Sequence, residues 1–217
     1  MPPTPGPTAE VNSTEAYHRG ELAIALDTAH AAHILPPTAP TGARILDIGC
    51  GAGQTLIAAY PDRTAFGIDV DHSALALGRQ WTDHVCFVQG RAESLPLPGA
   101  QFDLVISRTS LCYTDLKRSL PEARRVLRPG GRLWITLHPF GIAWRQVRLA
   151  SPRSWLYFTY VLLNSALFHY FGHQVRWFGR YESFQTEAGM RRALERCGFA
   201  EVRVTQGRHF VMEAKAR

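Results

Sequence analysis

Three closely spaced glycines and a downstream aspartate are the residues of this 217-residue chain best suited to bind a ligand. Gly49, Gly51 and Gly53 follow a short apolar run, the pattern of a strand that turns into a helix. Glycine lets the backbone approach a ligand closely, and the helix behind it offers free N–H groups. Asp69 ends a second apolar run sixteen residues after Gly53, where a carboxylate can accept both hydroxyls of a ribose. The pattern predicts a nucleoside site.

Two classes of nucleoside cofactor compete for this loop. A dinucleotide site needs glycine at the third position of G-x-G-x-x-G, where this chain has Gln54. Asp47 lies two residues before Gly49, and its carboxylate would repel a pyrophosphate but attract an ammonium group. The loop therefore favours a nucleoside that carries an amino acid, and an NAD-dependent oxidoreductase is the alternative.

The segments around these residues alternate between strands and helices. Short apolar runs predict five strands, over residues 43–48, 65–70, 85–89, 102–107 and 132–137. Helices are expected over residues 54–60, 73–81 and 116–127. This alternation with short links predicts an α/β fold with a parallel, Rossmann-like doubly wound sheet.

The two ends of the chain differ in their patterns. Residues 1–14 are rich in proline and are expected to form a flexible tail, followed by a helix over 15–35. Near the other end a helix over 186–197 precedes two strands, 199–205 and 208–214. Because only a short turn at Gly207 joins these strands, they are expected to pair as a hairpin, and one must run antiparallel to the rest of the sheet.

Composition indicates a single globular domain over residues 15–217. Apolar residues make up 46% of the chain and charged residues 19%, which argues against a disordered protein. The four cysteines are far apart and have no zinc-binding spacing, so no metal site is predicted. The first residues lack the basic region and apolar core of a secretory signal, so a cytoplasmic protein is expected.

Residues 139–185 do not fit the alternation and form an insertion after the fifth predicted strand. A helix is expected to begin at Ser151 and Pro152, and residues 154–175 contain no Asp, Glu, Lys or Arg. A helix that is apolar nearly all round is buried or meets lipid. We expect a lid that presents aromatic surface to a substrate, with a core helix as the plainer alternative. Arginines on both sides of 154–175 also favour peripheral contact with a membrane.

The successive motifs of the chain resemble those of class I S-adenosylmethionine (SAM)-dependent methyltransferases. The resemblance rests on LDIGCGAG, GIDVD, GRAESLPLPGAQFDLVISR, LRPGGRLWITLHP and RCGFAEVRV, and it covers residues 41–138 and 184–214. It implies a seven-stranded sheet with an antiparallel last strand, S-adenosyl-L-methionine as cofactor, and methyl transfer as the activity.

The resemblance also implies roles for the loop. The three glycines would line the methionine and ribose parts of SAM, with Cys50 as a small filler between them. Asp47 would act near the amino group, directly or through water. Asp69 would hold the ribose hydroxyls.

The adenine and methionine ends of the cofactor have their own candidates. Val70 would cover one adenine face. Arg91 and Ala92 stand where the family often has Asp-Ala, so the Ala92 N–H would serve the adenine edge while Arg91 replaces the usual acid. Ser107 and Arg108, at the end of the fourth predicted strand, would lie beneath the methionine end. The replacement at Arg91 leaves open a SAM-binding protein without transfer activity.

The catalytic candidate is His138, which directly follows the fifth predicted strand and is expected to act as a base. The alternative is a histidine that shapes the turn before Pro139. Tyr113 is a candidate pocket residue. Tyr17 and His18 are candidates to close over the cofactor from the N-terminal helix.

Charge and composition bear on the acceptor. Residues 117–217 carry a net charge of +12, whereas residues 1–116 carry −6. The aromatic insertion favours a small, apolar or lipid-like molecule as the acceptor. Nucleic acid is not expected, because no recognisable RNA-binding module accompanies the positive charge. That charge nevertheless makes a methyltransferase of RNA or protein the alternative, and the sequence indicates no oligomeric state.

Overall fold

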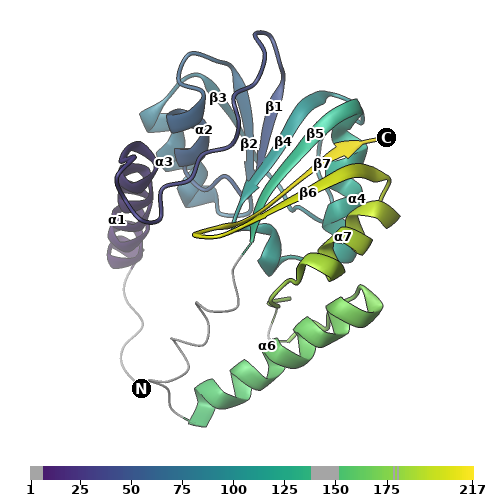
Figure 1. The fold of residues 1–217 in the computed structure, drawn as a ribbon. Helices are drawn as coiled ribbons and strands as arrows, with labels where there is room; N and C mark the ends of the chain where they lie inside the picture. Colours follow the sequence, from purple (N-terminus) through teal and green to yellow (C-terminus); the bar gives the residue numbers. More distant parts are fainter. Residues whose placement is uncertain (1–6, 138–151, 178, 180) are drawn as a thin grey trace.

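The computed structural model describes residues 7–137, 152–177, 179 and 181–217, and it contains one seven-stranded sheet (Figure 1). The strands are β1 (Ile45–Ile48), β2 (Ala65–Asp69), β3 (Val85–Gln89), β4 (Phe102–Arg108), β5 (Leu127–Leu137), β6 (Phe199–Gln206) and β7 (Phe210–Ala216). Their order is β3-β2-β1-β4-β5-β7-β6, and β7 runs antiparallel to both β5 and β6. The predicted α/β sheet with an antiparallel last strand is therefore confirmed.

Helices cover both faces of this sheet (Figure 1). The described helices are α1 (Pro7–Leu26), α2 (Gln54–Ala59), α3 (His72–Trp81), the 3-10 helix η1 (Leu111–Tyr113), α4 (Leu116–Val126), α6 (Pro152–Phe171) and α7 (Glu187–Arg196). The first three lie against the half of the sheet formed by β1 to β3, with α1 outermost. The other face is covered by α4 and α7, and α6 packs on α7.

The side chains of β1 show how the core is divided between the two faces. Leu46 and Ile48 point into one apolar cluster beneath α4 and α7, while Ile45 joins a second cluster beneath α2 and α3. Side chains alternate between the faces of a strand, so Asp47 shares the face of Ile45. This strand thus places one carboxyl under the glycine loop.

The N-terminal helix differs from its predicted range. It begins at Pro7, so residues 7–14 are helical in the structure and the predicted tail is wrong there. Proline suits the first turn of a helix, where its missing N–H has no intrahelical partner to lose. The helix ends at Leu26, nine residues before Leu35, because the Asp27 carboxylate accepts a hydrogen bond from the Ala29 N–H (2.9 Å) and closes a turn.

The fifth strand is longer than predicted. Leu127 already pairs with Phe102 on β4, and regular pairing resumes where Arg132 meets Leu104. The intervening Pro129-Gly130-Gly131 segment is an irregularity within β5, with Gly130 at φ 78°. The predicted strand over 132–137 is the regular part of this element.

The helix expected within the insertion is present as α6. Phe158, Val161, Asn164 and Phe168 form its buried face. None of the helices in the described part of the chain is long and apolar enough to cross a membrane.

Candidate functional site

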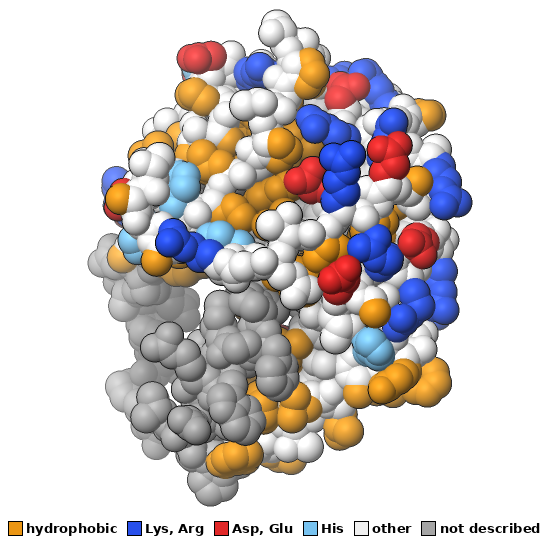
Figure 2. Space-filling model, in the orientation of Figure 1, with side chains coloured by type: hydrophobic (Ala, Val, Ile, Leu, Met, Phe, Trp, Pro, Cys, Tyr) orange, Lys and Arg blue, Asp and Glu red, His pale blue; other side chains and the backbone are white. Residues whose placement is uncertain are grey.

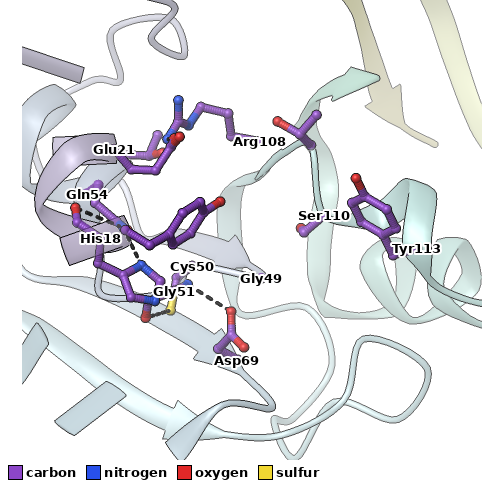
Figure 3. Close-up of a pocket in the computed structure, with 13 residues that line it drawn as sticks. His18, Glu21, Gly49, Cys50, Gly51, Gln54, Asp69, Arg108, Ser110 and Tyr113 are labelled. Carbon is purple, nitrogen blue, oxygen red and sulfur yellow. Dashed lines mark hydrogen bonds and ion pairs between the residues drawn. The ribbon is translucent and has the colours of Figure 1, made fainter. Parts of the chain in front are cut away.

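A cavity of about 360 Å³ opens at the carboxyl ends of β1, β2 and β4 (Figure 3). Parallel α/β sheets place ligand sites at this edge. One wall consists of the glycine loop and the start of α2, another of the segment after β4, and the third of α1. The lining residues are Tyr17, His18, Glu21, Gly49, Cys50, Gly51, Gln54, Thr55, Asp69, Arg108, Thr109, Ser110 and Tyr113.

Gly49 is required for the close packing of the first two walls. It has φ 77°, and a Cβ at this position would lie 2.2 Å from Ser110 Oγ. The Ser110 hydroxyl donates a hydrogen bond to Ile48 O at 2.6 Å, and it also lies 2.6 Å from Ser107 Oγ. Ser107 is fully buried and does not line the cavity. Ser107 therefore lies behind Ser110. Ser110 faces the cavity itself, and the sequence analysis did not predict it as a site residue.

Gly53 and Cys50 serve the packing of the loop. Gly53 has φ 82°, and a Cβ there would lie 2.8 Å from the Phe87 ring. It is the N-cap residue of α2 and is not among the cavity-lining residues, and its place beside the cofactor stays a prediction. The Cys50 thiol fills the space above Gly67, where a Cβ would lie 2.7 Å from Sγ. Burial raises the pKa of Cys50, which fits its predicted role as a filler.

Asp69 ties the end of β2 to the glycine loop. Its Oδ2 accepts a hydrogen bond from the Gly51 N–H at 2.8 Å, and its Oδ1 accepts one from the Asp71 N–H at 3.0 Å. The cap of α3 is Asp71, whose carboxylate accepts from the N–H groups of Ser73 and Ala74. Asp69 therefore does not cap a helix, and its carboxylate lies on the cavity wall, as the dashed line in Figure 3 shows.

Asp47 lies beneath this loop and not on the cavity surface. It is 1% exposed, and its Oδ1 has no hydrogen-bond partner among the described residues. Burial raises the pKa of Asp47 to about 7, an effect that Arg108 opposes and Asp69 reinforces. A buried carboxyl oxygen without a donor is costly. The loop thus holds an acceptor that a cationic or N–H-bearing ligand group, or a water, can satisfy.

The site continues beyond Asp69 into a second hollow of about 360 Å³. This hollow extends from Tyr17, His18 and Asp69 towards Asp71 and Ala74.

Three predicted adenine contacts follow β2 and β3 near this end of the site. Val70 is 57% exposed, whereas Ala92 is buried. The Arg91 guanidinium lies 3.5 Å from Glu93 and is largely exposed. None of these three lines either hollow.

Side chains of α1 form the third wall. His18 Nδ1 lies 2.6 Å from Gln54 Nε2, and burial lowers the pKa of His18, so a neutral ring accepts from the amide. Glu21 pairs with Arg108 at 2.6 Å, with both side chains mostly buried. The predicted closure by Tyr17 and His18 agrees with their place in the cavity wall. Glu21 was missed, since no local pattern links it to Arg108.

The turn after β4 contains a strained residue. Thr109 has φ 62°, which is rare for a β-branched side chain. Its N–H donates to Thr136 O at 3.2 Å, and its carbonyl accepts from the Cys112 thiol. Strain of this kind concentrates at functional sites. Here it turns the chain so that Thr109, Ser110 and Tyr113 all face the cavity.

Two predicted pocket or catalytic residues have different outcomes. Tyr113 lines the cavity, and burial raises its pKa, so its hydroxyl is neutral at pH 7. His138 lies outside the described residues, and its role as a base stays a prediction.

The sheet order and the glycine loop opposite an acidic strand end define an α/β protein with a nucleoside site. Residues 46–135 match the family model of a methyltransferase domain. This segment, which contains the glycine loop and Asp69, is therefore similar to methyltransferase domains.

Individual relatives that the chain matches in part are methyltransferases too. The chain is 36% identical over 128 residues to a malonyl-[acyl-carrier protein] O-methyltransferase of Methylococcus capsulatus, covering 53% of this chain and 45% of that protein. It is 38% identical over 99 residues to a phthiotriol/phenolphthiotriol dimycocerosates methyltransferase of Mycobacterium leprae, covering 43% and 37%. The chain thus matches less than half the length of each.

A solved structure supports the fold over nearly the whole chain. A SAM-dependent methyltransferase of Thermotoga maritima, described as a possible histamine N-methyltransferase, superposes with a TM-score of 0.61 at 21% identity. The superposition covers 95% of this chain and 96% of that one.

The described residues fit SAM as a ligand. Gly49 and Gly51 form a cradle that side chains would fill, since a Cβ on Gly51 would lie 2.9 Å from His18. Asp69 supplies a carboxylate on the wall, and the unpartnered Asp47 oxygen lies below the loop. An amino acid attached to a nucleoside presents an ammonium group and ribose hydroxyls to these acceptors.

Proposed function

We propose that this chain is a SAM-dependent methyltransferase that acts on a small, apolar or lipid-like acceptor. The observation that carries the proposal is the cavity between Gly49, Gly51 and Asp69, with the unpartnered Asp47 oxygen beneath it. A pyrophosphate would find a buried acid where it needs donors.

SAM supplies an activated methyl group on a sulfonium, so the protein has to bind, orient and exclude water. The Gly49 and Gly51 backbone would hold the methionine part. Asp69 would accept the ribose hydroxyls, and Asp47 would face the ammonium group. The Asp69 carboxylate is held by the N–H groups of Gly51 and Asp71 before any ligand arrives.

The remaining walls suit an acceptor with apolar surface. Tyr17 and Tyr113 bring aromatic rings to the cavity, and α1 forms one of its walls. Holding two reactants in a productive geometry can supply roughly 7–11 kcal/mol of a barrier. A positioned base would add to this, and His138 is the proposed group. Relatives named for malonyl-[acyl-carrier protein] and for phthiotriol/phenolphthiotriol dimycocerosates support this class of acceptor.

The proposal is tested by calorimetric titration of the purified chain with SAM, S-adenosylhomocysteine and NAD. Both sulfur nucleosides are expected to show saturable binding, whereas NAD is expected to show none. Asp69→Ala should weaken SAM binding by about 2 kcal/mol, or roughly 30-fold, through loss of hydrogen bonds to a charged acceptor. Asp69→Asn keeps one acceptor oxygen and should lose less. NAD binding without SAM binding would overturn the assignment and restore the oxidoreductase alternative.

A further inference from the structure

The two faces of α6 are both apolar, but only one of them is buried. Phe158, Val161 and Phe168 pack towards the protein and are at most 6% exposed. On the opposite face Leu156 is 60%, Leu163 62% and Tyr170 72% exposed. Figure 2 shows hydrophobic side chains gathered along the lower edge of the molecule, where Figure 1 places α6.

This outer face continues at both ends of the helix. Trp155, near the start, is 52% exposed, and Phe171 and Val175, at and beyond the end, are 67% and 49% exposed. Residues 154–175 contain no Asp, Glu, Lys or Arg. Trp155 and Tyr170 are separated by about 22 Å along the helix axis at 1.5 Å per residue. Such amphipathic rings favour the boundary between water and hydrocarbon.

Cationic side chains stand beside the C-terminal end of this face. Arg192 on α7 donates a hydrogen bond to the His169 carbonyl, and a Cβ on Gly172 would lie 3.1 Å from the Arg196 guanidinium. Arg176 follows the helix and is exposed. Within the described part of the chain, none of these three arginines lies within ion-pair distance of an acidic side chain. Figure 2 shows Lys and Arg side chains above the lower hydrophobic edge.

We propose that the outer face of α6, defined by Trp155, Leu156, Leu163, Tyr170 and Phe171, docks the protein on an anionic lipid surface. An apolar strip with cations beside its C-terminal end matches hydrocarbon bordered by negative headgroups, and basic residues near such a surface strengthen the attachment. Because the other face of α6 is buried against the protein, the helix lies along the membrane plane. This docking is independent of the methyl transfer proposed above.

The test is flotation of the full chain with phosphatidylcholine vesicles, with and without about one third phosphatidylglycerol, at low and high salt. The chain should float with the anionic vesicles at low salt and only weakly with the neutral ones. The double variant Leu156→Ser/Leu163→Ser should lose at least about tenfold in vesicle affinity because it removes apolar area from the contact.

Two further variants separate the contributions. Leu26→Ser is the matched control, since Leu26 is 61% exposed but lies at the end of α1, and it should float like the unmodified chain. Arg176→Glu/Arg196→Glu should remove the preference for anionic vesicles. Each variant is checked by circular dichroism and by SAM titration, so that a folding defect is recognised.

Other outcomes would overturn the proposal. Equal flotation of the unmodified chain and the double serine variant, or no flotation of the folded chain at low salt, would exclude the docking. A dimer in light scattering that the double serine variant converts to monomer, without vesicle binding, would assign the face to a second copy. Neither result would change SAM binding, so the proposed methyltransferase activity is judged separately.

Discussion

The glycine-loop wall and the α1 wall of the cavity are held by different kinds of contact. On the loop side, Gly49 packs directly on Ser110 and the Gly51 N–H is bound by Asp69, all within short strand-to-helix turns. On the α1 side, two side-chain contacts connect distant segments, His18 with Gln54 and Glu21 with Arg108. The loop wall depends on backbone shape, whereas the α1 wall depends on a few polar pairs.

This difference predicts how each wall responds to change. A substitution in the loop meets backbone strain and a fixed neighbour, because interiors are close-packed and relax little. A substitution on α1 removes one pair and leaves the helix free to reposition. The first should therefore affect folding and binding together, and the second should affect the opening of the site.

The largest effect is expected at Gly49. Gly49→Ala would force a Cβ against Ser110 while the backbone keeps φ 77°, and it should lower the free energy of unfolding by about 3 kcal/mol and abolish SAM binding. Gly42→Ala is the matched control, with φ 79° but nothing within 4 Å of the added Cβ, and should cost about 1 kcal/mol. Denaturant unfolding measures both. Similar losses in the two variants would show that the contact with Ser110 is unimportant.

A smaller effect is expected at Asp47, and its size depends on pH. Burial raises the pKa of this carboxyl from 3.8 to about 7, so the native state binds the proton more tightly than the unfolded state between these values. Stability should therefore fall as pH rises from about 4 to about 7, and Asp47→Asn should be more stable than the unmodified chain by about 2 kcal/mol at pH 8. Thermal unfolding at pH 5 and pH 8 measures this.

The same residue should link binding to protonation. An ammonium group near Asp47 favours the ionised carboxylate, so SAM binding at pH 7 should release up to about half a proton per molecule. Calorimetry in two buffers of different ionisation enthalpy would detect it. An Asp47→Asn variant that binds SAM normally, with no change in proton release, would remove the residue from the site.

The smallest effect is expected at the α1 wall. Glu21→Gln weakens the ion pair with Arg108. It should lower the free energy needed to open α1 by about 1 kcal/mol, because solvent only partly screens the pair. Hydrogen exchange of the α1 amides should speed up several-fold, while the stability of the sheet is unchanged. A double-mutant cycle with Arg108→Gln would show whether the two residues act as a pair. Unaltered exchange would mean that packing alone holds α1.

Local sequence patterns were sufficient to predict the glycine-loop wall but not the α1 wall. Apolar runs ending in glycine or Asp69 predicted β1, β2 and the loop, because strand and turn are specified within a few residues. The Glu21–Arg108 pair joins residues 87 positions apart, and no local pattern indicates it. Gln54 was used only to exclude a dinucleotide site, yet its amide binds His18 and lines the cavity.

One wrong helix boundary and one unpredicted contact both depend on tertiary packing. The helical pattern continued past Leu26, but the Asp27 side chain closes a turn there. Gly53 was predicted to line the cofactor because it belongs to the loop. Its packing against the Phe87 ring from β3 was not predicted, because that contact requires the folded sheet.

The strained turn at Thr109 has a consequence for protein engineering. A glycine at φ 62° would relieve roughly 1–2 kcal/mol of backbone strain, so any redesign that optimises stability alone would replace this threonine. Thr109 lines the cavity beside Ser110 and Arg108. A thermostabilised version of the chain should therefore keep this residue and seek its gains elsewhere.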